Sequence, residues 1–153
     1  MPLTSPHFSF AELTRTDLRY VSNVPSEEQA KRLVVLAHDF LEPLRAQFGP
    51  LRIHSGFRSL TVNGIIGGSP TSAHPHGAAA DLSAIRPEVT IEEMARWLRA
   101  STLPVDQVID ERGLGAGWLH VGMALPWINS GVPRREFLTM RLGRHPLYQP
   151  LPE

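Results

Sequence analysis

The sequence of 153 residues contains no cysteine. Disulfide bridges and thiolate metal sites are therefore excluded. The chain also carries no excess charge, because fifteen lysines and arginines balance fifteen aspartates and glutamates. A chain without a positive field has little means of attracting a polyanion, so we expect no nucleic-acid partner.

Long apolar runs are missing as well. No stretch approaches the roughly 20 apolar residues that a membrane-spanning helix needs. The first thirty residues show no cationic start followed by an apolar core, which is the pattern of a secretory signal. We therefore expect no membrane partner, no signal peptide and synthesis in the cytoplasm.

The composition that remains is that of an ordinary folded protein, with 42% hydrophobic and 20% charged residues. A chain of this length is large enough to bury one core and too short to promise two. We predict a single domain over residues 1–153, with a core over about 8–142, an extended tail at 143–153 and a monomeric state.

Helix and strand patterns alternate along the chain. Ser9 with Glu12, and Thr90 with Glu93, are spaced as capping boxes, and apolar residues recur at helical spacing over 27–48, where Pro43 should disturb the last turns. Strands are predicted at 51–55, 79–84, 105–111, 118–123 and 135–142, with the third and fourth joined across the turn 112–117. This order predicts an α+β fold with a central, mainly antiparallel sheet, helices packed on one side, and any site at the sheet edge and loops.

Three potential metal ligands stand out, although spacing alone does not make them a site. His74 and Asp81 flank a glycine and a run of alanines. In "GWLHVG" the alternation turns His120 away from Leu119 and Val121, which are core formers. Two imidazoles and one carboxylate suit a hydrolytic Zn²⁺ that keeps one position open. Each residue also has an ordinary structural interpretation. His74 can be a polar loop residue, Asp81 can cap or hydrogen-bond a neighbouring loop, and His120 can be a histidine at the boundary of the core.

A family resemblance strengthens the metal interpretation. The stretch "SGFRSLTVNGIIGGSPTSAHPHGAAADL", followed by "VDQVIDE" and "GWLHVG", resembles the D-alanyl-D-alanine carboxypeptidase-type zinc peptidases. This superfamily shares its zinc-site architecture with hedgehog signalling domains and includes bacterial and phage peptidoglycan peptidases. Its signature is Ser-x-His, Gly-x-Ala-x-Asp and Trp-x-His. These elements match Ser72, His74, Gly77, Ala79, Asp81, Trp118 and His120, and the upstream Ser-Gly-Tyr-Arg-Ser element matches residues 55–59.

The resemblance implies a role for each matched residue. His74, Asp81 and His120 would hold one zinc ion per chain. Arg58 would bind a substrate carboxylate or the carbonyl oxygen of the scissile bond, a task suited to its planar, permanently charged fork. Ser72 and Trp118 would contact substrate. The alternatives for Arg58 and Ser72 are structural: a link between loops and a loop cap.

The general base departs from the pattern of some relatives, which carry an acid three positions before the last histidine. Gly117 stands there in this chain. The smaller members place an acid at the end of the preceding strand, which corresponds to Glu111, with Asp110 as the reserve. A carboxylate there can take the proton of the attacking water. His76 is an additional imidazole beside the site, and we interpret it as a rim histidine.

Three functions stay open at this point. The first is a zinc peptidase of D,D-carboxypeptidase or endopeptidase type that acts on peptidoglycan, such as a phage lysis enzyme released by a holin. The second is a catalytically silent relative that binds cell wall or another protein, which the glycine at position 117 favours. The third is a non-haem iron enzyme with the same ligand set. Such enzymes usually place His and Asp two residues apart, whereas His74 and Asp81 are seven apart.

Overall fold

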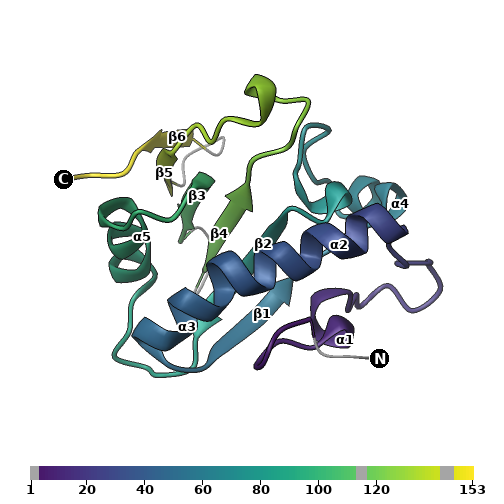
Figure 1. The fold of residues 1–153 in the computed structure, drawn as a ribbon, viewed down its shortest axis with the longest axis horizontal. Coiled ribbons are helices and arrows are strands. Elements are labelled where there is room, and N and C mark those ends of the chain that lie inside the picture. The colour runs from purple at the N-terminus through teal and green to yellow at the C-terminus, as the bar shows by residue number, and fades with distance from the viewer. Residues whose placement is uncertain (1–3, 113–116, 142–146) are drawn as a thin grey trace.

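A six-stranded sheet organises the chain (Figure 1). The computed structural model describes residues 4–112, 117–141 and 147–153. The strands are β1 (Leu51–Ser55), β2 (Ala79–Ala84), β3 (Val105–Glu111), β4 (Trp118–Met123), β5 (Glu136–Arg141) and β6 (Leu147–Pro150). They lie in the order β1-β2-β4-β3-β5-β6. All neighbouring pairs are antiparallel except β3 and β5, which run parallel.

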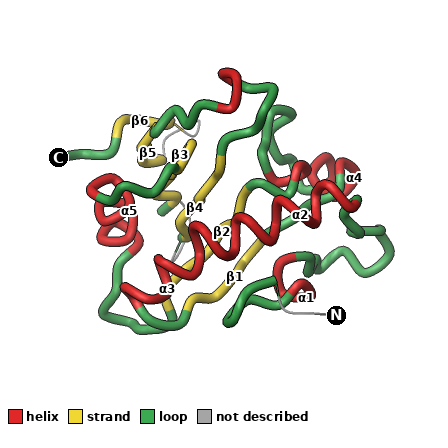
Figure 2. The backbone as a smooth tube through the Cα atoms, viewed as in Figure 1, coloured by secondary structure: helices red, strands yellow, loops and turns green. Residues whose placement is uncertain are grey.

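Helices cover one face of this sheet, as Figure 2 shows. The described helices are α1 (Phe10–Leu13), α2 (Glu27–Leu36), α3 (Glu42–Phe48), α4 (Leu60–Ile65) and α5 (Ile91–Ala100), with short helical turns η1 (Ala37–Leu41), η2 (His74–His76) and η3 (Asn129–Gly131). The face is covered mainly by α2, α3 and α5. The apolar faces of α2, α3 and α5 join alternate sheet residues, among them Leu82, Leu119 and Val121, in one core. The predicted α+β class with helices on one side is therefore confirmed.

The predicted capping box is complete at Thr90–Glu93, whereas at Ser9–Glu12 only the bond to the Ser9 side chain is present in the described structure. Ser9 accepts a hydrogen bond from the backbone of Glu12, and Thr90 does the same for Glu93, whose side chain bonds back to the cap. Each interaction satisfies backbone N–H groups that have no partner in the first helical turn. α1 itself lies beside β1, because the N–H of Phe57 donates to the carbonyl of Leu13 at 2.8 Å.

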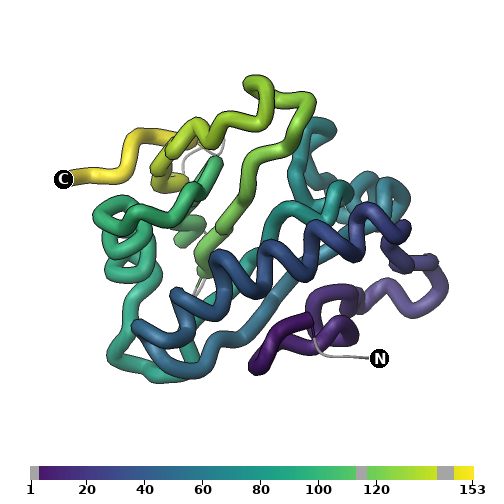
Figure 3. Tube along the Cα trace, viewed as in Figure 1, coloured from purple at the N-terminus to yellow at the C-terminus, as the bar shows by residue number. Residues whose placement is uncertain are grey.

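The long helix of 27–48 is interrupted by the π-helical turn η1, which joins α2 to α3 (Figure 3). There the N–H of Glu42 donates to the carbonyl of Ala37 instead of to its usual partner one residue later. Pro43 follows directly and has no N–H to continue the ladder. The widened turn accommodates the proline while Phe40 and Leu41 stay buried.

The C-terminal part adds what the sequence pattern did not predict. Leu147–Pro150, expected to be an extended tail, forms β6 and pairs with β5. The predicted turn between β3 and β4 falls largely on 113–116, outside the described residues. No helix in the described part of the chain is long and apolar enough to cross a membrane.

Candidate metal centre

The three candidate ligands converge on the sheet face opposite the α2–α3 helix, which we call the open face. Asp81 on β2 pairs in register with His120 on β4, and His74 reaches them from η2. Their potential ligand atoms all lie within 4.8 Å of one another. His74 Nε2 lies 3.2 Å and His120 Nδ1 2.9 Å from the same oxygen, Asp81 Oδ1. The site is thus placed over the adjacent interior strands β2 and β4, with one ligand from η2.

The backbone around His74 explains how the loop reaches the sheet. Gly77 ends η2 with a φ of 72°, a left-handed conformation that favours glycine. A Cβ at this position would lie 2.3 Å from the carbonyl oxygen of Gln29. Only glycine therefore lets the turn pass this close to α2 before β2 begins.

Hydrogen bonds outside the cluster set the orientation of His74. Its Nδ1 lies 2.6 Å from the carbonyl oxygen of Gly56, which can only accept, so Nδ1 carries the proton and donates. Nε2 is the nitrogen that faces Asp81. Without its proton, it would offer a lone pair to a bound metal ion. Metal-binding histidines are commonly oriented by such a carbonyl.

The donor set fits a zinc ion. The three ligand residues are buried, at most 9% exposed, and they supply two imidazole nitrogens and one carboxylate oxygen. Burial alone would raise the pKa of Asp81, but the charges and hydrogen bonds of His74 and His120 outweigh it and hold that pKa well below its usual range. The carboxylate is therefore ionised, as metal binding requires. Three protein ligands leave a fourth position for water or substrate.

Arg58 lies against the metal centre. Its guanidinium donates to Asp81 Oδ2 at 2.7 Å and, through Nε, to Ser55 Oγ at 2.8 Å. The two oxygens of Asp81 are thus divided, with Oδ1 towards the histidines and Oδ2 towards Arg58. These contacts give Arg58 a role in orienting a metal ligand, and its contact with substrate stays a prediction.

This placement predicts the effect of removing Arg58. We expect Arg58→Ala to weaken zinc binding about 10-fold to 100-fold, the usual effect of losing a group that orients a ligand. Competition with a chromogenic chelator measures this affinity without substrate. Arg45→Ala, on α3 in the helix layer, is the control. Unchanged zinc affinity in Arg58→Ala would return the residue to a purely substrate-binding role.

Glu111 lies at the end of β3 on the open face, directly across from Trp118 in the β3–β4 register. Trp118 Nε1 donates to Glu111 Oε2 at 2.7 Å, and the hydroxyl of Tyr148 lies 3.5 Å from Oε1. Burial and the nearby charge of Asp81 raise the pKa of Glu111, while His120 and the Trp118 hydrogen bond oppose the rise. A carboxyl with a raised pKa beside a metal site suits general acid–base chemistry.

Asp110 and Gly117 account for the two open questions about the base. Asp110 is fully buried on the helix-covered face, where it pairs with Arg112, so it cannot reach the ligand cluster. Gly117 has a φ of 69°, and a Cβ there would lie 2.6 Å from the carbonyl oxygen of Glu111. Position 117 therefore has no room for an acidic side chain, and Glu111 is the carboxylate on the open face beside it.

The remaining expected site residues occupy supporting positions. Ser72 Oγ accepts a hydrogen bond from the backbone N–H of His74 at 3.2 Å, which is the loop-capping alternative. His76 packs edge-to-face on Trp127, and the guanidinium of Arg32 lies 5.0 Å from the centre of the same indole. Arg32 also donates to the carbonyl of His76. This stack ties η2 to α2 and to the segment after β4.

Sequence reasoning missed Tyr148 and Trp127. Both are aromatic side chains that the structure leaves about half exposed, a property that the sequence alone does not show. Their partners lie far away in sequence, so only the structure shows that Tyr148 reaches Glu111 and that Trp127 reaches His76.

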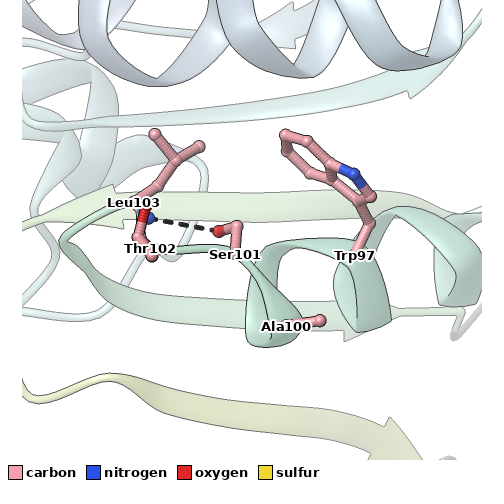
Figure 4. A pocket seen from close by; sticks show the side chains of 5 residues that line it. All are labelled: Trp97, Ala100, Ser101, Thr102 and Leu103. Atoms are coloured by element: carbon pink, nitrogen blue, oxygen red, sulfur yellow. Dashed lines mark hydrogen bonds between the residues drawn. The ribbon is translucent and has the colours of Figure 1, made fainter.

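The pocket drawn in Figure 4 is separate from this centre. It lies at the end of α5 and is lined by Trp97, Ala100, Ser101, Thr102 and Leu103. Within its lining, the N–H of Leu103 donates a hydrogen bond to Ser101 Oγ. None of its lining residues is titratable, so it offers no acid–base or metal chemistry.

Comparison with known proteins agrees with the geometry. The zinc D-Ala-D-Ala carboxypeptidase of Streptomyces albus G is 34% identical over 83 residues, which are 53% of this chain and 32% of that protein. The chain therefore spans about a third of the length of this relative. The family described as peptidase M15 matches residues 6–112, a range that includes His74, Asp81 and Glu111 and ends before His120. Since this match covers well over half of the 153 residues, the chain belongs to the peptidase M15 family.

Proposed function

We propose that this protein is a zinc-dependent peptidase that hydrolyses a peptide bond in peptidoglycan stem peptides or cross-links, as a D,D-carboxypeptidase or endopeptidase. The observation that carries the proposal is the convergence of two imidazoles and two carboxylates on one sheet face, with Asp81 and Glu111 in different surroundings. Asp81 is held ionised by its partners, whereas the pKa of Glu111 is raised. When the surroundings of two nearby carboxyl groups move their pKa values in opposite directions, one group suits metal binding and the other suits acid–base chemistry.

Each residue then has a separate task. A bound zinc ion would polarise the scissile carbonyl and acidify the attacking water. His74, Asp81 and His120 would hold that ion, and Arg58 keeps the Asp81 carboxylate in its orientation. Glu111 would accept the proton of the attacking water and deliver it to the leaving amine, while Trp118 fixes the position of its carboxylate.

Hydrolysis of defined substrates by the zinc-loaded protein tests the proposal. Purified muropeptide monomers and cross-linked dimers are digested, and mass spectrometry identifies the bond that is cut. Cleavage of a stem or cross-link bond is expected. No cleavage across the panel by protein of verified zinc content would contradict it and leave the binding-module alternative, while elemental analysis separates zinc from iron.

The setting of this activity is part of the proposal. We propose that the protein, made in the cytoplasm, acts as a monomer on the cell wall after release, in the manner of a phage lysis enzyme. Expression in bacteria with and without a holin tests this, since lysis is expected only when the holin is present. Lysis without a holin, or none with it, would contradict this setting.

The raised pKa of Glu111 predicts a pH effect for Trp118→Phe. A base must be ionised, so activity is lost as the pH falls through the pKa of Glu111, which lies above its ordinary value because of burial and Asp81. The Trp118 hydrogen bond lowers this pKa. Its removal is therefore expected to move the acid limb of kcat/KM to higher pH. The comparison is with Trp97→Phe, and an unmoved limb would contradict the prediction.

A further inference from the structure

A strip of polar and cationic side chains continues from the metal centre along the open face towards α1. Ser83 follows Asp81 by two residues on β2 and so lies on the same face. Arg52 on β1 is the register partner of Ser83. His54 Nε2 lies 2.7 Å from Ser83 Oγ, which joins the two strands within this strip. The strip therefore begins beside a metal ligand and ends at the edge of the sheet.

The strip opens into a depression between α1 and β1. Its volume is about 600 Å³, and it is lined by Ala11, Glu12, Arg15, Arg52 and Ile53. Arg15 and Arg52 are both exposed. Within residues 4–112, 117–141 and 147–153, no carboxylate lies within ion-pair distance of either guanidinium. Both arginines can therefore bind an anion from solution.

Electrostatic coupling links this depression to the metal centre. Burial and the charges of Arg52 and Arg15 lower the pKa of His54, while the charge of Asp81 opposes them. Both arginines and a metal ligand therefore act on one imidazole. Glu12 is in the same depression, and its pKa is raised by burial and lowered by Arg15. When ionised, Glu12 compensates part of the charge of Arg15, which leaves Arg52 as the main available cation.

Arg58 is paired with Asp81, whereas Arg52 has no ion-pair partner among the described residues and is available to a substrate carboxylate. We propose that Arg52, assisted by Arg15 and the His54–Ser83 pair, forms a subsite for a carboxylate of the peptide substrate on the α1 side of the metal centre. The subsite rests on the proposed peptidase function. Two residues of strand span about 6.6 Å, and a peptide extends about 3.3–3.6 Å per residue. The recognised carboxylate therefore lies within a few residues of the scissile bond.

The carboxylate can be the C-terminal one or that of a side chain, and matched peptides separate these sources. An N-acetylated stem pentapeptide ending in D-Ala-D-Ala is compared as the free acid, as the C-terminal amide and with its side-chain carboxyls amidated. For the peptide with all its carboxylates free, Arg52→Gln is expected to lower kcat/KM about 10-fold to 100-fold, the range of a charge-assisted hydrogen bond. Amidation of the recognised carboxylate should make kcat/KM equal in wild type and Arg52→Gln. The amidated peptide that does so, at the C-terminus or at the side chains, identifies that carboxylate.

Controls make the outcome specific. Arg45→Gln, in the helix layer on the opposite face of the sheet, should match wild type with every peptide. Arg52→Lys should restore part of the loss, since it keeps the charge without the planar fork. An equal loss for the acid and both amides, or no loss in Arg52→Gln, would overturn the subsite.

Binding to the zinc-loaded protein, measured by calorimetry, separates the subsite from the reaction. If the wild type cleaves none of the peptides but binds the acid more tightly than an amide, and Arg52→Gln abolishes the difference, peptidase function fails while the subsite stands. If cleavage occurs with no dependence on Arg52, the subsite fails and the peptidase function stands. Absence of both cleavage and binding overturns both.

Discussion

Replacing His74 or His120 by alanine is expected to remove most of the bound zinc and all hydrolysis. Either variant leaves one imidazole and the Asp81 carboxylate, and two protein ligands do not make a zinc site of the usual kind. Both histidines are buried beside Asp81 Oδ1, so each variant leaves one ligand position of the cluster without a donor atom. Elemental analysis of dialysed protein measures the metal, and muropeptide digestion measures the activity.

A surface histidine provides the control for this loss. His38 is exposed on η1, so His38→Ala should keep one zinc per chain and full activity. Far-ultraviolet circular dichroism of the variants checks that the fold persists without metal. Full zinc occupancy in His74→Ala or His120→Ala would show that the assigned ligand is wrong.

Glu111→Gln is expected to keep the fold and the zinc while cutting the hydrolysis rate about 10²-fold to 10⁴-fold, the usual contribution of a positioned acid–base group. Glutamine preserves the shape of the side chain, and its amide oxygen can still accept from Trp118 Nε1. What is lost is the capacity to take a proton. Rates are compared at equal zinc occupancy so that a metal defect cannot mimic a base defect.

Variants of two other carboxylates serve as controls for this experiment. Glu88→Gln, in an exposed turn, should leave the rate unchanged. Asp110→Asn should lower thermal stability, because the fully buried carboxylate of Asp110 forms an ion pair with Arg112. The rate per folded molecule should stay near wild type. A rate loss in Asp110→Asn that exceeds the loss in Glu111→Gln would reassign the base.

Local patterns predicted the elements that carry the metal centre. The alternation in "WLHVGM" placed His120 opposite in direction to Leu119 and Val121, and both of these are buried in the core under the helices. Capping residues located the starts of α1 and α5. These signals are readable because periodicity and caps depend on residues only a few positions apart.

Contacts between distant segments could not be predicted in this way. Arg58 fits a substrate-binding role in the motif, and only the fold shows that Asp81, 23 positions away, takes its guanidinium. β6 and Tyr148 were missed because a four-residue strand has too short a pattern to distinguish it from an extended tail. The parallel pairing of β3 with β5 likewise depends on the path of the chain between them.

The shared register of Asp81 and His120 has a consequence for folding. These residues are 39 positions apart, and His74 adds a third point of attachment from outside the sheet. A metal ion bound there is a cross-link between η2 and the interior strands β2 and β4, in a chain that has no cysteine to form a disulfide. Its binding free energy adds directly to the free energy of unfolding, since the unfolded chain does not present the three ligands together. The same ion would thus act as a removable staple, and a chelator would loosen the centre of the sheet as well as stop the chemistry.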